Sequence, residues 1–324
     1  MKKRTLTYFF SILSFLIVLF AMDYLIGNLC RKNYFERNHG VLYRTTYSID
    51  STKEEILVFG SSRANHHYAP EAFEDSLKMS FFNTGREGCF IYYQLAVIKS
   101  VTKRYTPKII LLDLNPLDFL DTTDTYDKLN CLLPYYKTHE EIRSIINLRR
   151  FEKLRLISNI YPFNHCLFNL GRNKPENVVY EHKIKGFEAF NVVWNHPRRH
   201  QLETGEKFIY DTNKITAYKE FIDICNKNHI KLFVIISPFY FDLNANTKKM
   251  IALTRNITLE HKVDFLDFSQ DSSIINHSSL FLDERHLNLT GANFFSGMLA
   301  GKIKEEIKKS TNTLANISDT SLIY

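Results

Sequence analysis

Short apolar segments alternate with longer segments of helical spacing along the chain from residue 55 onward. The apolar segments, which we expect to be β-strands, cover residues 56–59, 79–82, 108–113, 231–237 and 263–266. The intervening segments that we expect to be helices cover residues 69–78, 94–102, 217–228, 250–260 and 292–307. Strands that are apolar at nearly every position are typical of a parallel sheet covered on both faces. The pattern therefore predicts an α/β protein, a three-layer α/β/α sandwich with about five parallel strands.

The first thirty residues follow a different pattern. Basic residues at positions 2–4 precede an uncharged run over 5–22, and the apolar character continues beyond Asp23. A run of about 20 residues is long enough to cross the roughly 30 Å hydrocarbon core of a bilayer. A cleaved signal peptide has a shorter apolar region and a small-residue cleavage site, and no Ala-x-Ala pattern follows Met22. The pattern favours a short cytoplasmic stub and an uncleaved transmembrane helix over residues 1–30.

The distribution of basic residues around this helix predicts its orientation. Lysine and arginine are enriched on the cytoplasmic side of membrane helices, so the N-terminal cluster favours a cytoplasmic N-terminus. Arg31, Lys32 and Arg37 on the other side give the opposite signal. We expect a single-pass membrane protein whose remaining chain is periplasmic or extracellular.

The rest of the chain divides by composition. Residues 31–54 are polar and irregular and indicate a linker, residues 55–310 form the α/β domain, and residues 311–324 indicate a flexible tail. An insertion over 118–212 interrupts the domain, lacks clear strand signals and is rich in aromatic and basic residues. It is either a solvated, largely helical insertion or a cap that steers an anionic polymer or lipid head group.

Composition narrows the classes of function. The net charge of +7 is modest for 324 residues, and no recognition helix, zinc spacing or RNA-binding signature is present, so we expect no nucleic-acid partner. The five cysteines have no CxxC spacing, which indicates neither a metal cage nor a disulfide framework, although one bridge stays open. We expect no metal and no cofactor.

Three of the expected strands are followed by small or polar residues. Ser62 comes just after the first strand, the segment 83–88 with its two glycines follows the second, and Asn115 follows the third. The carboxyl ends of parallel strands meet at one edge of the sheet, where ligands bind. Each segment taken alone also fits an ordinary turn, because serine, glycine and asparagine are common there.

A fourth segment lies just before the last helix. Asp283 stands three residues before His286, so its carboxylate can accept a hydrogen bond from Nδ1 and leave Nε2 free to take a proton from a serine. A lone histidine would more often be structural or exposed. Combined with the serine turn after the first strand, the pair indicates a nucleophile, a base and an orienting carboxylate.

These four segments resemble the motifs of the SGNH/GDSL hydrolase superfamily. Residues 60–63, Gly-Ser-Ser-Arg, are similar to its first block, with Ser61 where Asp is usual and Arg63 where Leu is usual. Residues 83–88 resemble the second block, residues 113–115 the third, though without its usual Gly-x-Asn-Asp, and residues 283–292 the fifth. The resemblance covers residues 55–117 and 213–308 and implies a flavodoxin-like SGNH fold.

The resemblance also implies roles for individual residues. Ser62 would be the nucleophile, with His286 as the base and Asp283 as its partner, and the oxyanion would be held by Ser62 N–H, Gly88 N–H and Asn115. The substrate would be an acylated small molecule or cell-envelope polysaccharide. A hydrolase and an O-acyltransferase share this site, and a non-catalytic glycan-binding protein of the same fold is the alternative from another class.

Three further residues near the serine have more than one interpretation. Arg63 either points into solvent or pairs with an acid, or else contacts an anionic group of the substrate. His66 and His67 have no evident carboxylate partners in the sequence, which disfavours a metal-assisted or phosphodiesterase-like enzyme. We expect these two histidines at the surface or in contact with substrate.

Overall fold

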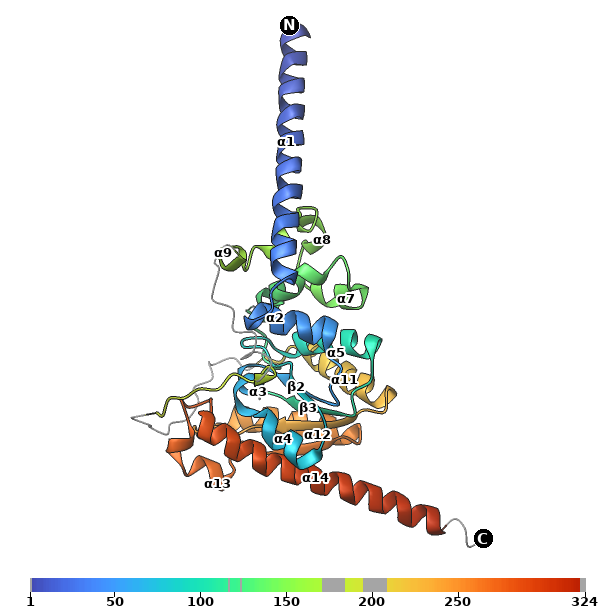
Figure 1. The fold of residues 1–324 in the computed structure, drawn as a ribbon, viewed down its shortest axis with the longest axis vertical. Coiled ribbons are helices and arrows are strands. Elements are labelled where there is room, and N and C mark those ends of the chain that lie inside the picture. The colour runs from blue at the N-terminus through green and yellow to red at the C-terminus, as the bar shows by residue number, and fades with distance from the viewer. Residues whose placement is uncertain (1, 116, 123, 171–183, 195–208, 321–324) are drawn as a thin grey trace. The chain divides into compact units, whose positions relative to one another are not determined.

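The computed structural model describes residues 2–115, 117–122, 124–170, 184–194 and 209–320. The chain divides into two compact units, which are considered separately (Figure 1). Residues 1–46 and 123–178 form the N-terminal unit, and residues 47–122 and 179–324 form the sheet unit.

The sheet unit contains the five strands that the sequence predicts. They are β1 (Ile56–Gly60), β2 (Phe81–Asn83), β3 (Ile109–Asp113), β4 (Lys231–Ile236) and β5 (Asp264–Asp267). All neighbouring pairs are parallel, in the order β2-β1-β3-β4-β5. The chain thus adds β2 on one side of β1 and the later strands on the other side. A reversal of this kind, here between β1 and β3, is where α/β sheets bind ligands.

Helices cover both faces of this sheet. On one face lie α3 (Ser62–His67), α4 (Pro70–Leu77) and α14 (Leu289–Thr320), and on the other lie α5 (Ile91–Arg104), α11 (Thr212–Lys227) and α12 (Ala245–Glu260). Side chains alternate along each strand, so Val58 belongs to the core beneath α14, whereas the Phe59 ring meets that of Phe221 on α11 at 5.3 Å. The three-layer α/β/α prediction is confirmed.

Local sequence signals explain where several of these helices begin and end. Asp211 caps α11 by accepting a hydrogen bond from the backbone N–H of Asn213, and Asn244 caps α12 by accepting one from Thr247. α4 begins at Pro70 and ends at Leu77, and the C-cap residue Lys78 has a left-handed φ of 55°. The smaller helices of this unit are η1 (Tyr47–Ser51), α13 (Ser272–Ile275) and η5 (Ser278–Leu280).

All the elements described in the N-terminal unit are helices, joined by short turns. Its elements are α1 (Lys2–Phe35), α2 (Gly40–Thr46), α6 (Asp124–Asp127), η2 (Lys128–Tyr135), η3 (Glu140–Ile142), α7 (Arg143–Ile146), α8 (Glu152–Arg155), η4 (Tyr161–Phe163) and α9 (Leu167–Leu170). Among the helices described, α1 alone is long and apolar enough to cross a membrane, by length and composition. The apolar N-terminal helix is therefore confirmed; a signal sequence would have the same properties.

Three boundaries differ from the sequence prediction. The linker expected over 31–54 is helical, because its apolar residues Tyr34, Leu42 and Ile49 are buried. The insertion expected over 118–212 is not one body, since 123–178 belong to the N-terminal unit. In place of a tail from 311, α14 continues to Thr320, in a stretch that contains neither glycine nor proline. The last four residues lie outside the described part.

Candidate active site

β1 ends in a turn that requires glycine. Gly60 has a φ of +148°, and a Cβ atom added there would lie 2.6 Å from the carbonyl oxygen of Asp113 and 2.7 Å from Cβ of Ala64. No side chain fits at such distances. The close approach lets the chain turn from β1 directly into α3, whose first residue is Ser62.

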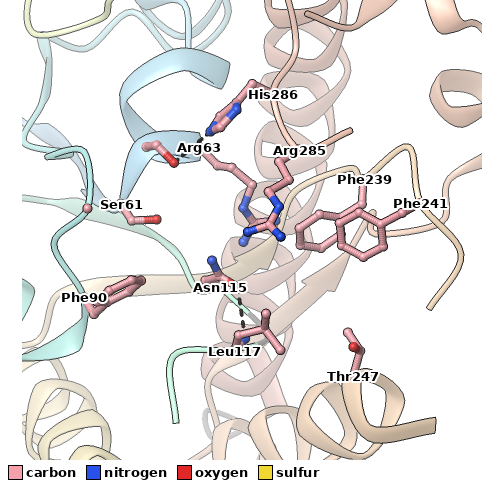
Figure 2. Close-up of a pocket in the computed structure, with 12 residues that line it drawn as sticks. Ser61, Arg63, Phe90, Asn115, Leu117, Phe239, Phe241, Thr247, Arg285 and His286 are labelled. Carbon is pink, nitrogen blue, oxygen red and sulfur yellow. Dashed lines mark hydrogen bonds between the residues drawn. The ribbon is translucent and has the colours of Figure 1, made fainter. Parts of the chain in front are cut away.

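The structure brings Ser62, Asp283 and His286 together. His286 Nε2 lies 2.8 Å from Ser62 Oγ, and His286 Nδ1 lies 3.0 and 2.9 Å from the two carboxylate oxygens of Asp283. Figure 2 shows the His286 ring directed toward the serine at the start of α3. A hydroxyl, an imidazole and a carboxylate in this series can transfer the hydroxyl proton to the imidazole.

The carboxylate of Asp283 also shapes the loop that carries the histidine. It accepts hydrogen bonds from the backbone N–H groups of Arg285 at 2.7 Å and His286 at 2.8 Å. Burial opposes its ionisation, but the hydrogen bonds from the His286 ring and these N–H groups outweigh burial and lower the pKa of Asp283 below its ordinary value. An ionised Asp283 keeps the proton of His286 on Nδ1 and leaves Nε2 to accept from Ser62.

Three groups expected to hold an oxyanion line the same cavity of about 150 Å³. Ser62 N–H stands at the first position of α3, where helix geometry offers no intrahelical acceptor. Gly88 has a φ of +69°, which favours glycine. Asn115 accepts a hydrogen bond from Leu117 N–H at 3.0 Å through its amide oxygen, and Figure 2 shows its amide nitrogen directed into the cavity.

Part of the cavity wall is apolar. This part is formed by Phe90, Leu117, Phe239 and Phe241, with Thr247 at one side (Figure 2). A cavity of about 150 Å³ is large enough for a small organic group. Among the described residues, no group of three or more His, Cys, Asp or Glu side chains could hold a metal ion.

Arg63 lines the cavity but is occupied by protein partners. Its guanidinium donates to the carbonyl oxygens of Ser237 at 3.0 Å and Leu114 at 2.9 Å, and it lies 3.2 Å from Asp113. The group also lies 4.1 Å from the centre of the Phe239 ring. Of the interpretations that the sequence left open for Arg63, the structure agrees with pairing to an acid. Arg63 therefore holds the ends of β3 and β4 together below the cavity.

His66 and His67 are not surface residues, so the surface alternative of that expectation is wrong, and contact with substrate stays a prediction. Both lie in the last turn of α3 and are 2% and 0% exposed. His67 Nε2 accepts from Leu287 N–H at 3.0 Å and Nδ1 lies 3.1 Å from Ser237 Oγ. Burial lowers the pKa of His67 well below its ordinary value, so the ring is neutral. It thus fixes the backbone immediately after His286.

The sequence reasoning missed a segment that packs beside the site. Residues 184–194 bond to other parts of the sheet unit at several points, among them Phe190 O, which accepts from Leu289 N–H at 2.7 Å. The Phe190 ring lies 4.0 Å from that of His66. This segment of the expected insertion thus packs beside His286, which neither a motif nor a periodicity would reveal.

Arg285 is a further part of the site that the sequence reasoning missed. Its side chain lines the cavity and points into it in Figure 2, and it lies 3.3 Å from the Glu284 carboxylate. Its position in the sequence between Asp283 and His286 is the signal that could have predicted a place at the cavity. Unlike Arg63, its guanidinium is about half exposed and can meet a substrate.

Asp118 predicts a pH dependence of stability. It is buried after the Asn115 turn, and burial raises its pKa to about 7 although Arg63 and Lys214 act in the opposite sense. The folded state therefore prefers the protonated acid. The contribution of this preference to the stability of the folded state is complete below about pH 4, the ordinary pKa of aspartate. It is lost as the pH rises toward 7, the pKa of Asp118 in the folded state.

We expect Asp118→Asn to remove this loss. The variant should gain stability relative to wild type between pH 4 and 7, reaching ~2–4 kcal/mol at pH 8, or several degrees in Tm. Thermal unfolding of the detergent-solubilised chain at pH 5 and pH 8 measures the gain. The exposed Asp121→Asn is the matched control. A Tm difference that is the same at both pH values would contradict the assignment.

The known proteins that resemble this chain are solved structures of low sequence identity to it. No family model matches the chain, and no curated protein matches it. Similar structures include the psychrotrophic esterase EstA from Pseudoalteromonas sp. (10% identity, 78% of this chain and 98% of that one, TM-score 0.42). An acetyl xylan esterase has 12% identity over 78% of this chain and 99% of its own, with a TM-score of 0.41. A GDSL-like lipase from Bacteroides thetaiotaomicron has 12% identity over 86% and 98%, with a TM-score of 0.40.

These similarities are distant and concern architecture. At such identities and TM-scores, the chemistry of the site has to be inferred from this chain's own residues. Those residues define an α/β protein with a serine, a histidine and an aspartate in hydrogen-bond contact at the switch point of its sheet.

Proposed function

We propose that the chain is a serine hydrolase of the SGNH/GDSL type that acts on ester-linked acyl or acetyl groups. The observation that carries the proposal is the 2.8 Å contact between Ser62 Oγ and His286 Nε2, with Asp283 on the other ring nitrogen. Such a contact activates a serine, because the imidazole can accept the hydroxyl proton as the oxygen attacks.

In the first half of the proposed reaction, Ser62 Oγ bonds to the ester carbonyl carbon while His286 Nε2 takes its proton. The carbonyl oxygen becomes an oxyanion, which Ser62 N–H, Gly88 N–H and the Asn115 amide stabilise. When the intermediate collapses, the bond to the alcohol oxygen breaks and His286 returns the proton to that oxygen. The product is an acyl-enzyme on Ser62.

The second half decides between hydrolase and transferase. Water, deprotonated by His286, releases the acid, whereas a sugar hydroxyl in the same place takes the acyl group as a new ester. Isotope from labelled water in the released acid identifies the hydrolase. Transfer of the acyl group to an added oligosaccharide at the expense of free acid identifies the O-acyltransferase.

We place the proposed enzyme in the cell envelope. The length and composition of α1 support a single membrane crossing, and the basic residues at positions 2–4 support a cytoplasmic N-terminus. The sheet unit would then be periplasmic or extracellular, where acylated polysaccharide or lipid is the available substrate. Release of acetate from native envelope glycan by the wild type and by Ser62→Ala tests the substrate class.

Arg285 predicts a preference for anionic esters. Its half-exposed guanidinium lines the cavity, so an anionic group near the scissile ester gains a favourable but solvent-screened interaction. We expect Arg285→Gln to lower kcat/KM about 5-fold for anionic esters, and less than about 2-fold for neutral esters of equal size. Arg255→Gln, a half-exposed arginine on α12, is the control. An equal loss on both ester classes would contradict charge recognition.

A further inference from the structure

The polarity of the segment around α8 is inverted relative to a water-exposed helix. Glu152, the first residue of α8, is 1% exposed. Its apolar neighbours Phe151, Leu154 and Ile157 are 60%, 66% and 64% exposed. They continue a spacing of three residues that starts at the partly exposed Leu148. We call residues 148–157 the α8 surface.

Glu152 holds this inverted arrangement in place. Its carboxylate accepts hydrogen bonds from Arg149 Nε at 2.9 Å, Arg155 Nη1 at 3.1 Å and the Tyr161 hydroxyl at 3.0 Å. A buried acid that is paired in this way is costly to expose. The apolar side chains on the other side of the segment are consequently fixed outward and cannot turn into the core of the unit.

The residues that follow the α8 surface are attached to α1. The Asp23 carboxylate on α1 accepts hydrogen bonds from Ser158 Oγ at 2.5 Å, from Asn159 N–H at 2.7 Å and from Ile160 N–H at 3.3 Å. One helical turn further along, Gly27 leaves no room for a side chain, because a Cβ atom there would collide with Asn159. Figure 1 accordingly draws α8 alongside α1, within the same unit.

The position of Asp23 along α1 sets the depth of this attachment. The uncharged run over 5–22 spans about 27 Å as a helix at 1.5 Å per residue, close to the roughly 30 Å of a bilayer's hydrocarbon core. Asp23 is the first charged residue after that run and therefore lies where the hydrocarbon core ends. With α1 placed in this way, Ser158, which donates to Asp23, lies at the boundary between acyl chains and headgroups, and Ile157 precedes it in the chain.

The charges around the exposed apolar residues match such a boundary. Arg150 and Lys153 are exposed between them, and the Arg150 guanidinium lies 4.7 Å from the centre of the Phe151 ring. Aromatic and aliphatic side chains interleaved with basic ones are the composition of segments that lie in the interface of anionic membranes.

We propose that the α8 surface docks on the bilayer that α1 crosses, with Phe151, Leu154 and Ile157 in the interfacial region. The proposal rests on the transmembrane placement of α1 made above. It gives the N-terminal unit two membrane contacts, one spanning and one interfacial. The second contact fixes how that unit is oriented on the membrane, which a single helix does not.

Depth-dependent fluorescence quenching tests the proposal on the full chain. The protein has one tryptophan, so Trp194→Phe provides a silent background for a single probe at a chosen position. The chain is reconstituted in vesicles of phosphatidylcholine and phosphatidylglycerol whose acyl chains carry bromine. We expect the Leu154→Trp probe to lose at least half of its emission relative to unbrominated vesicles.

Two further probes separate the possible outcomes. Phe15→Trp in α1 should be strongly quenched. Val41→Trp on α2, an exposed position of the same unit that Figure 1 draws at the far end of α1, should be unquenched. Quenching of the probe at residue 15 without quenching of the probe at residue 154 overturns the docking proposal alone. In that case, a blue-shifted emission from residue 154 would mean that protein, such as a second copy, covers the surface. Absence of quenching at residue 15 overturns the transmembrane placement and the docking with it. Equal quenching at residues 154 and 41 means nonspecific adsorption and also overturns the docking.

Discussion

Replacing Ser62 by alanine is expected to lower ester turnover by about 10⁴-fold or more while the chain still folds. The change removes the only atom that the proposed mechanism bonds to the substrate, and loss of a serine nucleophile that acts with a histidine and an aspartate has effects of this order. Hydrolysis of p-nitrophenyl acetate by the purified chain measures the loss. Circular dichroism and Tm verify that the fold persists.

Ser61→Ala is the matched control for this prediction. Ser61 is the neighbouring serine, is buried, and lines the same cavity, yet no step of the proposed reaction uses its hydroxyl. A fluorophosphonate probe should label wild type and Ser61→Ala at Ser62 and should not label Ser62→Ala. Folded wild-type chain that resists labelling would support the non-catalytic glycan-binding alternative instead. Retained turnover in Ser62→Ala would remove Ser62 from the mechanism.

Replacing Asp283 by asparagine is expected to lower kcat by roughly 10³–10⁴-fold. The asparagine keeps the shape of the side chain, but its amide can donate a hydrogen bond to His286 Nδ1 and so favours the tautomer with the proton on Nε2. A protonated Nε2 cannot accept the Ser62 proton across their 2.8 Å contact. Steady-state kinetics at pH 7 and at pH 9 test this, with activity expected to recover only in part at the higher pH.

The Asp271→Asn variant separates this effect from loss of a loop carboxylate in general. Asp271 caps α13 by accepting a hydrogen bond from Ser273 N–H at 2.9 Å, much as Asp283 accepts from Arg285 N–H. Asparagine is about as good an N-cap as aspartate, so this variant should change stability little and leave kcat within about 2-fold of wild type. If Asp283→Asn lowered Tm as little as Asp271→Asn and left kcat equally unaffected, Asp283 would be a structural residue only.

The agreement between sequence and structure is best where the signal is local. The segment 231–237 is predicted as a strand because it is apolar at consecutive positions, and β4 (Lys231–Ile236) has five of its six residues buried. Four candidate segments were expected to converge because they follow strands or precede the last helix. The parallel order of the sheet then brings Ser62, Asn115 and His286 to one cavity.

The disagreements occur where the environment of a residue is provided by distant parts of the chain. His67 has no evident carboxylate partner in the sequence and was expected at the surface or in contact with substrate, but its partners Ser237 and Leu287 are 170 and 220 residues away. The role of Arg63 depends in the same way on the ends of β3 and β4. Residues 31–54 looked like a linker because their buried apolar positions are few and widely spaced.

By itself, the sequence determined the apolar N-terminal helix, the five strands and the residues that could form a nucleophile, a base and an oxyanion hole. These follow from periodicity, from the length of an apolar run and from the convergence of parallel strands at one edge, all of which are short-range or topological rules. Only the tertiary structure decided that Arg63 is tied to Asp113, that His67 is buried and neutral, and that Arg285 faces the cavity. The reason is that burial and hydrogen-bond partners depend on which distant segments pack together, and a single sequence does not specify that packing residue by residue.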